Sequence, residues 1–300
     1  MGNLKDTIRS LVPEFVLNWN RQRKKNAVNK QLEAQKTAGE IWTTKKLIQQ
    51  LQNIGIQNGD HVLVHSSMSK IGYLENGPKT FVDALLETVG EEGTVLMPSS
   101  PNAQLQLNYI RENPVFDVRN SPSRLGAITE YFRKLPNAHR SLNATEPVVA
   151  LGAEAEFFTN GHFGELTPYT SSSPFARLAE KGGKILYVGV TLANAGTSLH
   201  VLEDAVDFHF PVYFSEIFDV EVIDYDNVKH KVKTKVHNPE MSIRRRCDEL
   251  LPHFESAGIA QKVQLGNAQT WLFDAKKMKD WMIKSYLEKG ITMYTPNGNE

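Results

Sequence analysis

Short apolar runs, each followed at once by polar residues, constrain the fold of this chain most strongly. Val62–His65 leads into a serine-rich turn, Gly93–Pro98 leads into Ser99 and Ser100, and Lys184–Val190 leads into a loop. Helical patterns lie between these runs. Strands that alternate with polar loops and helices are typical of an α/β sheet, which binds ligands at the carboxyl ends of its strands. We therefore predict an α/β fold with a central mixed sheet flanked by helices.

The last third of the chain has a different pattern. Val220–Asp224 and Lys231–Val236 alternate apolar and polar residues with period two, which is typical of strands with one buried face. We predict a smaller antiparallel β portion at about residues 210–270. Helices are expected at about residues 246–256 and 275–288.

Helix starts follow from capping residues. Ser121 followed by Pro122 is a good N-cap with proline in the first helical position, so a helix should start there. Thr197 is a plausible N-cap for a helix that follows the strand-like run ending at Val190.

Residues 1–40 differ from the rest of the chain. They are rich in Lys, Arg, Asn and Gln, and an apolar stripe of Leu11, Phe15 and Trp19 precedes basic residues. This pattern predicts a basic amphipathic helix, which would form an N-terminal arm outside a catalytic domain at residues 41–300. Weak contact with an anionic membrane surface is one interpretation. The interpretation we favour is that the arm packs on its own subunit or on a neighbouring one, and the second case would form a homo-oligomer.

The charge and the cysteine content of the chain exclude some classes of binding partner and of metal site. The chain has 34 Lys and Arg against 34 Asp and Glu, so nothing indicates a nucleic-acid partner, and we expect a small-molecule substrate. Cys247 is the single cysteine, which excludes an internal disulfide and a cysteine-rich zinc site. The three arginines before it would lower the pKa of its thiol. No long apolar run predicts a signal peptide or a membrane span, so we expect a cytoplasmic protein.

His200 and Glu203 form the candidate acid–base pair. They lie three residues apart directly after a strand and loop, and residues at this spacing share a helix face. Glu203 would hold the imidazole in one tautomer and raise its basicity, leaving the other nitrogen to accept a proton from a substrate. A surface ion pair or a buried structural histidine has the same spacing. A metal site is weakly indicated, because a second His and Glu pair is lacking.

Ser66, Ser67 and Ser69 form a candidate phosphate-binding loop. Small polar residues between a strand and a helix offer backbone N–H groups and hydroxyls to a phosphate or pyrophosphate. The chain has neither the glycine fingerprint of dinucleotide-binding folds nor the lysine pattern of a P-loop. Serine caps of this kind are also common without a ligand.

Taken together, eight ordered segments resemble the aminoglycoside 3-N-acetyltransferase family. They are His65–Ser69, Gly93–Pro98, Ser121–Gly126, Glu130–Arg133, Arg140–Ser141, Ser173–Pro174, Gly183–Gly189 and Thr197–Glu203. The resemblance covers about residues 43 to 290 and leaves only the N-terminal arm outside. It implies acyl transfer to an amine from acetyl-CoA or another short acyl-CoA, without a metal, on an α/β fold particular to the family.

The resemblance also assigns roles by position. His200 is similar to the general base of the family and Glu203 to the carboxylate that orients it. The segment that begins at His65 and contains Ser66, Ser67 and Ser69 resembles the loop that holds the coenzyme A pyrophosphate. Ser123 and Arg124 belong to a second segment near the cofactor.

Asn143 marks a departure from the family pattern. The family has a histidine where this chain has Asn143, three residues after Arg140. An amide can donate a hydrogen bond to an oxyanion, worth on the order of 3 kcal/mol if aimed correctly, but it carries no proton at neutral pH. A catalytic and a purely structural role are both open.

The sequence also leads to predictions for the mechanism and the acceptor. We expect direct transfer with His200 as base, because Gly-x-Ser-x-Gly is absent and no covalent acyl-enzyme is required. The neutral chain lacks the acidic excess expected for a polycation, and its basic residues suit a diphosphate. A nucleotide-linked amino sugar for surface polysaccharide synthesis is therefore the predicted acceptor, and an aminoglycoside antibiotic is the alternative.

Overall fold

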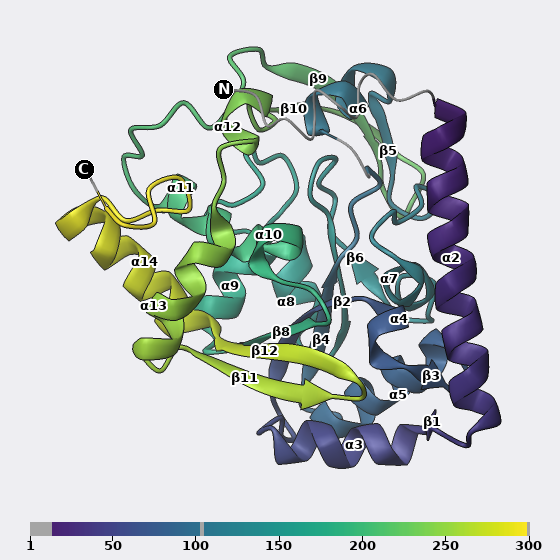
Figure 1. Cartoon of the computed structure of the whole chain (residues 1–300). Coiled ribbons are helices and arrows are strands. Elements are labelled where there is room, and N and C mark those ends of the chain that lie inside the picture. The colour runs from purple at the N-terminus through teal and green to yellow at the C-terminus, as the bar shows by residue number, and fades with distance from the viewer. Residues whose placement is uncertain (1–13, 103–104, 299–300) are drawn as a thin grey trace.

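The computed structural model describes residues 14–102 and 105–298, and its centre is a mixed sheet of seven strands (Figure 1). The strand order is β11-β12-β8-β2-β4-β7-β6, and β8, β2 and β4 run parallel, whereas the flanking pairs are antiparallel. The strands are β2 (His61–Ser66), β4 (Thr94–Pro98), β6 (His139–Arg140), β7 (Val148–Gly152), β8 (Lys184–Val188), β11 (Ala260–Leu265) and β12 (Ala268–Asp274). The predicted central mixed sheet is confirmed.

Helices cover both faces of this sheet, because successive side chains of its central strands point alternately into two hydrophobic cores. Val62 and Val64 of β2 face one core with α3 (Thr44–Asn53), α5 (Pro78–Val89) and α7 (Ala127–Phe132). Leu63 faces the other core, which contains helices from the second half of the chain. These are α8 (Ala155–Asn160), α9 (Pro174–Glu180), α11 (Val201–Ala205), α13 (Leu251–Ser256) and α14 (Ala275–Lys289). Residues i and i+2 of a strand share a face, which explains the continuous apolar run.

A second, three-stranded sheet lies at the top of Figure 1. β9 (Phe218–Ile223) pairs antiparallel with β10 (Lys229–Thr234) and parallel with β5 (Val115–Asp117) from the middle of the chain. The predicted smaller antiparallel portion is therefore present, but its predicted extent to about residue 270 is wrong. β11 and β12 extend the central sheet instead, because β12 pairs with β8. Alternation within a strand does not reveal which sheet the strand joins.

The remaining short elements connect these layers. They are β1 (Ile41–Trp42), β3 (Tyr73–Leu74), α4 (Met68–Ile71), α6 (Gln106–Glu112), α10 (Leu192–Ala195), α12 (Pro239–Ser242) and the 3₁₀ turns η1 (Thr197–His200) and η2 (Cys247–Leu250). The predicted helix start at Ser121 is wrong, because the Ser121 hydroxyl accepts a bond from the Asp117 N–H at 2.9 Å and α7 begins at Ala127. Thr197 is the first residue of η1 rather than its cap.

Arg140 connects the central sheet to the accessory sheet. Its buried guanidinium donates to the hydroxyl and carbonyl of Ser99 and to the carbonyl of Ser121. It also lies 4.9 Å from the ring centroid of Phe116 in β5. Charge-assisted bonds of this kind are roughly twice as strong as neutral ones, so Arg140 fixes the loops at the carboxyl end of β4.

The N-terminal arm is a long helix, α2 (Glu14–Thr37), which runs along one side of the molecule (Figure 1). Near its end, Gln35 accepts a hydrogen bond from the Tyr73 N–H at 3.1 Å, and the Lys36 ammonium lies 5.4 Å from the Tyr73 ring centroid. Trp19 is 61% exposed. Leu11 and the side chain of Phe15 lie outside the described residues, so the amphipathic stripe and any contact with a membrane or second subunit stay predictions.

Deletion of residues 1–30 should leave soluble catalysis unchanged. The contacts of α2 with Tyr73 come from Gln35 and Lys36, which this deletion retains. We expect kcat within about twofold of the full-length value, because most side chains that the structure describes at residues 19–30 are exposed and polar. Kinetics combined with size-exclusion chromatography checks this. Simultaneous loss of activity and of an oligomer would instead identify a subunit arm.

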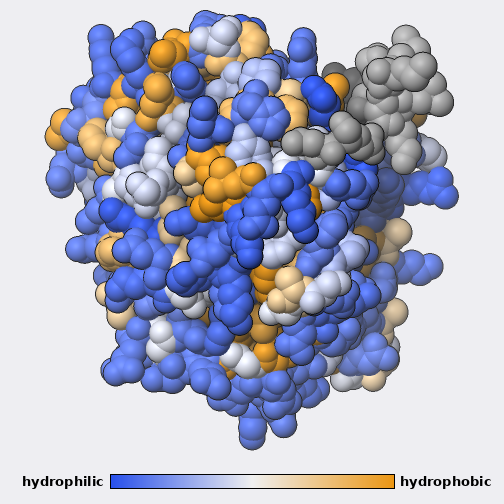
Figure 2. All heavy atoms as spheres, turned by 90° about the vertical axis from the view of Figure 1, so that its left-hand side faces the viewer, coloured by the Kyte–Doolittle hydropathy of each residue, from blue (hydrophilic) through white to orange (hydrophobic). Residues whose placement is uncertain are grey.

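The surface is mostly hydrophilic on the side that carries α14, where apolar side chains form separate small patches (Figure 2). Within residues 14–102 and 105–298, we find no helix with the length and apolar character needed to cross a bilayer.

Candidate active site

His200 and Glu203 lie where the chain leaves the carboxyl end of β8 and turns back across the sheet. η1 ends at His200 and continues directly into α11, which contains Glu203. Val201 and Leu202 are buried in the core between them. This anchoring places the two polar side chains on one face, as their spacing predicts, and each residue is only 5% exposed.

The Glu203 carboxylate is the centre of a buried network. Its Oε1 lies 2.9 Å from His200 Nδ1 and accepts a 2.7 Å hydrogen bond from the Tyr294 hydroxyl. Its Oε2 lies 2.9 Å from His237 Nε2. The His200 contact has a short distance without the alignment of a hydrogen bond. Catalytic hydrogen bonds are often poorly aligned before substrate binds, and a small ring rotation would complete this one.

His200, Glu203 and His237 also have the composition of a metal site, since their ligand atoms lie within 4.8 Å of one another. However, one nitrogen of each imidazole already lies 2.9 Å from a separate oxygen of the Glu203 carboxylate. Tyr294 supplies a further donor to the same carboxylate. These are the distances of charge-assisted hydrogen bonds. We therefore interpret the cluster as a proton-handling network organised by one carboxylate.

The pKa shifts agree with a neutral base beside an anion. Burial lowers the pKa of His200 to about 3 and outweighs the opposing effect of Glu203. Glu203 does raise the pKa of His200, as expected, but burial has the larger opposite effect, so His200 is less basic than a free imidazole. Burial lowers the pKa of His237 as well. For Glu203, burial alone would raise the pKa, but the two imidazoles hold it below its ordinary value.

This arrangement fixes the tautomer of His200. Nδ1 faces a carboxylate and must carry the proton, so the lone pair is on Nε2. No residue in the described ranges forms a hydrogen bond to that Nε2. Tyr169 packs against the rings of both His200 and His237, with centroid distances of 5.0 and 5.6 Å. The ring is therefore held in place with a proton acceptor available to a ligand.

His200 lines a cavity of about 250 Å³. Arg245 and Cys247 contribute to its wall, together with the turn from Leu192 to Thr197. Burial raises the pKa of the Cys247 thiol to about 11 and outweighs the lowering effect of Arg245, so the net lowering expected from the preceding arginines does not occur. A thiol with that pKa is almost entirely protonated at neutral pH and is a poor nucleophile.

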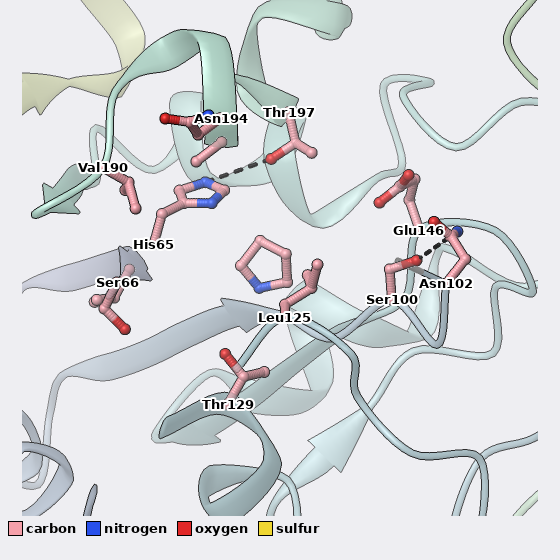
Figure 3. A pocket seen from close by; sticks show the side chains of 13 residues that line it. His65, Ser66, Ser100, Asn102, Leu125, Thr129, Glu146, Val190, Asn194 and Thr197 are labelled. Atoms are coloured by element: carbon pink, nitrogen blue, oxygen red, sulfur yellow. Dashed lines mark hydrogen bonds between the residues drawn. The ribbon is translucent and has the colours of Figure 1, made fainter. Parts of the chain in front are cut away.

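A second cavity of about 190 Å³ lies on the other side of the same turn. Figure 3 shows His65 and Ser66 on one side of it and Glu146, Ser100 and Asn102 on the other. Asn194, Ala195 and Thr197 line both cavities. The Thr197 hydroxyl lies 3.4 Å from His65 Nε2, at the boundary between them.

The chemistry of this second cavity is mixed. Burial raises the pKa of the Glu146 carboxyl to about 7, and Gln106 donates a hydrogen bond to it. Gln106 also accepts a bond from the His237 N–H at 3.1 Å. Burial lowers the pKa of His65 to about 3, so this imidazole is neutral. His65 stacks on Tyr187 with a centroid distance of 4.9 Å.

The structure brings some of the predicted cofactor residues together. His65 and Ser66 line the second cavity, whereas Ser67 and Ser69 follow directly in the chain and are half-buried. Ser67 precedes α4 without a side-chain cap, so its hydroxyl is not used to start that helix.

Ser123 and Arg124 lie beside this cavity rather than in its lining. The Ser123 N–H donates to Glu130 at 2.7 Å, and the Arg124 N–H donates to the Ser100 carbonyl at 3.0 Å. The next residue, Leu125, lines the cavity. Arg124 itself is exposed, so its guanidinium is available to a ligand that extends from the cavity.

Asn143 has the contacts of a structural residue. Its side-chain oxygen accepts bonds from the Thr145 N–H, the Thr145 hydroxyl and the Glu146 N–H at 3.0 to 3.1 Å. It lines neither cavity. These contacts fix the loop that carries Glu146, and they favour the structural over the catalytic interpretation left open by the sequence.

Several residues of the site were not identified from the sequence. His237 and Tyr294 lie 34 and 91 residues beyond Glu203, and Tyr169 precedes the pair in a loop. No spacing pattern joins residues so far apart. In the sequence, these residues are marked only as an aromatic residue or a histidine within a polar segment. Many positions unrelated to the site have the same character.

Comparison with known proteins gives a consistent result. The family model described as aminoglycoside 3-N-acetyltransferase matches residues 63–287. Aminoglycoside N(3)-acetyltransferase VII of Streptomyces paromomycinus is 29% identical over 270 residues, covering 82% of this chain and 92% of the relative. Aminoglycoside N(3)-acetyltransferase III of Salmonella sp is 29% identical over 279 residues, covering 85% and 95%.

Solved structures agree with these relatives. The structure of AAC-IIIb in a binary complex with CoASH has a TM-score of 0.70 at 28% identity, covering 85% of this chain and all of that chain. AAC-VIa bound to sisomicin has a TM-score of 0.68 at 26% identity, covering 82% and 97%.

These findings overturn the predicted acceptor. The relatives are aminoglycoside N(3)-acetyltransferases, so the prediction of a nucleotide-linked amino sugar for polysaccharide synthesis is wrong. The charge argument failed because the net charge of a whole chain does not describe its cavities. Here the half-buried carboxyl of Glu146 and the buried carboxylate of Glu203 lie within the site although the chain is neutral overall.

The matched span, the shared fold and the buried His200 imidazole that lines a cavity lead to one conclusion. The chain belongs to the aminoglycoside 3-N-acetyltransferase family and is an acetyl-CoA-dependent N-acetyltransferase.

Proposed function

We propose that this enzyme acetylates an amino group of aminoglycoside antibiotics, at the 3-position that names the family. The observation that carries the proposal is the neutral His200 imidazole, which is oriented by Glu203 and lines a cavity. The related AAC-VIa was solved with the aminoglycoside sisomicin bound, which supports the same class of acceptor here.

The transfer needs a base because an ammonium group is not a nucleophile. His200 Nε2 accepts a proton from the amine as its nitrogen attacks the thioester carbonyl, and Nδ1–H then faces the carboxylate of Glu203. The imidazolium that forms is stabilised by this anion, in the way an acidic residue stabilises histidine in other acyl-transfer sites. The reaction is a direct transfer, and the protonated Cys247 thiol takes no part.

Acetyl-CoA is the second substrate, and we place its binding at the second cavity. His65 and Ser66 at the end of β2 line that cavity, and the hydroxyls of Ser67, directly before α4, and of Ser69, within α4, follow in the chain. The exposed Arg124 lies next to the cavity-lining Leu125, where a cation suits the phosphates of the coenzyme.

Replacement of Ser66 by Leu should weaken acetyl-CoA binding before it affects the chemical step. The larger side chain would fill part of a cavity of about 190 Å³, and we expect the Kd for coenzyme A to rise about 10- to 100-fold, or roughly 1.4 to 2.8 kcal/mol. Isothermal titration calorimetry measures this directly. The matched control is Ser172→Leu, at a half-buried serine outside both cavities. An unchanged coenzyme Kd with a raised acceptor KM would assign Ser66 to the acceptor site.

The pH dependence should reveal the lowered pKa of His200. Between about pH 5 and pH 6 the acceptor amine is mostly protonated, and its reactive neutral form rises tenfold per pH unit. Because the pKa of His200 is about 3, log kcat/KM should rise with slope one over this range. If His200 had an ordinary pKa of about 6.5, it would also have to lose a proton over this range before it could act as a base. The slope of log kcat/KM against pH would then be two. Steady-state kinetics with circular dichroism at each pH separates this effect from unfolding.

The function itself is tested by release of coenzyme A thiol from acetyl-CoA with kanamycin, neomycin and gentamicin as acceptors. We expect amine-dependent release for at least one of them, with acetyl-CoA alone as the blank. UDP-linked glucosamine at equal concentration is the comparison acceptor. Release with the nucleotide sugar and with none of the three antibiotics would contradict the proposal.

A further inference from the structure

Arg245 is a cationic residue in the His200 cavity with an unused donor. Its side chain lines the cavity of about 250 Å³ together with His200. Its Nη2 atom is buried, and among the described residues it has no hydrogen-bond partner. On the other side of the guanidinium, Nε lies 3.5 Å from the Tyr294 hydroxyl, which donates to Glu203 at 2.7 Å. Tyr294 therefore contacts the Nε side of Arg245, whereas Nη2 of this cavity-lining residue is left without a partner among the described residues.

A buried N–H group of a cation without an acceptor is costly. Leaving a buried donor unsatisfied costs about 1 to 3 kcal/mol, and more when the group is charged. In a native protein such a group calls for an explanation, and a catalytic role or an acceptor bound at the site is one of them. Because Nη2 belongs to a residue that lines a cavity, the completing acceptor is expected on a molecule bound there.

The charge of the site identifies that acceptor. An amine near the base is a cation at neutral pH, so a guanidinium beside it would be repulsive, whereas a carbonyl oxygen that gains negative charge would be attracted. The acyl group of acetyl-CoA carries such an oxygen. Its carbon must also lie within reach of the amine that His200 deprotonates, and this places the oxygen in the cavity shared by His200 and Arg245.

We infer that Arg245 is a further catalytic residue, which donates a hydrogen bond to the thioester oxygen and stabilises the tetrahedral intermediate. The amine lone pair forms the C–N bond, the carbonyl π electrons move to the oxygen beside Arg245, and His200 takes the amine proton. The carbonyl then re-forms, the C–S bond breaks, and the coenzyme thiolate takes the proton from His200. This inference rests on the proposed acetyl transfer.

The test compares Arg245→Gln and Arg245→Lys with wild type in steady-state kinetics. Loss of a preorganised donor to an oxyanion lowers kcat about 10²- to 10³-fold. Because the acyl oxygen is common to every reaction, Arg245→Gln should lower kcat by a similar factor for each acceptor, with the KM for acetyl-CoA little changed. Arg245→Lys keeps the positive charge but lacks the planar guanidinium with its fixed N–H donors. Its kcat should therefore lie between those of Arg245→Gln and wild type. The matched control is Arg244→Gln, at the adjacent exposed arginine, with wild-type kcat.

The outcomes separate the alternatives. Wild-type transfer to an aminoglycoside is measured first, so failure of the proposed function is seen before any variant is compared. A raised KM for acetyl-CoA with wild-type kcat would make Arg245 a coenzyme anchor and overturn the inference. A lowered melting temperature with wild-type kcat would show that Arg245 only stabilises the position of Tyr294. That result would also overturn the inference. If Arg245→Gln does not fold, Arg245→Lys decides, since a kcat equal to wild type contradicts the inference.

Discussion

Replacement of His200 by Asn should lower kcat/KM for acetyl transfer about 10²- to 10⁴-fold, the usual contribution of a general base. The imidazole is the group in this cavity that is both neutral at pH 7 and held by an anion on its far nitrogen. The variant should retain wild-type affinity for coenzyme A, because the proposed coenzyme loop lies in the second cavity.

Steady-state kinetics and calorimetric titration of coenzyme A measure both effects on the same preparation. The matched control is His209→Asn, since His209 is exposed and lines neither cavity. Turnover of the His200 variant at the wild-type rate would show that the base has been assigned to the wrong residue.

Replacement of Glu203 by Gln should affect both activity and stability. The carboxylate faces donors from His200, His237 and Tyr294, and an amide can accept on only one of its two atoms. At least one buried donor then faces an N–H group, at a cost of about 1 to 3 kcal/mol of folding free energy. The wrong tautomer of His200 is also favoured, and we expect kcat to fall about 10- to 100-fold.

Urea unfolding and kcat are the two measurements for this variant. Glu165→Gln is a suitable control, because Glu165 is a half-buried carboxylate that accepts a hydrogen bond from Ser172 away from both cavities. Wild-type stability together with wild-type kcat would contradict the central position of Glu203 in the network.

The sequence predicts those parts of the fold that depend on local patterns. The strand positions of β2, β4 and β8 follow from short apolar runs, and α14 follows from its length and periodicity. The assignment of β11 and β12 to the central sheet depends on pairing with β8 across about 80 residues of chain, and no local pattern encodes such a pairing. The same limit explains why the accessory sheet was predicted to extend too far.

The candidate site also has a part that the sequence predicts and a part that it does not. His200 and Glu203 are three residues apart, so one helix face predicts their contact. His237, Tyr294 and Arg245 reach the same carboxylate or cavity only through the tertiary fold. The direction of the His200 pKa shift could not be predicted either, because it depends on burial, and burial overrides the neighbouring carboxylate.

The most direct test of the account is the position of the acetyl group on the product. Wild-type enzyme, acetyl-CoA and kanamycin are incubated to completion, and the product is analysed by mass spectrometry and two-dimensional NMR. We predict a single acetyl group on the 3-amino nitrogen, formed by the wild-type enzyme and strongly reduced with His200→Asn. An unmodified antibiotic, or an acetyl group on another nitrogen, would contradict it.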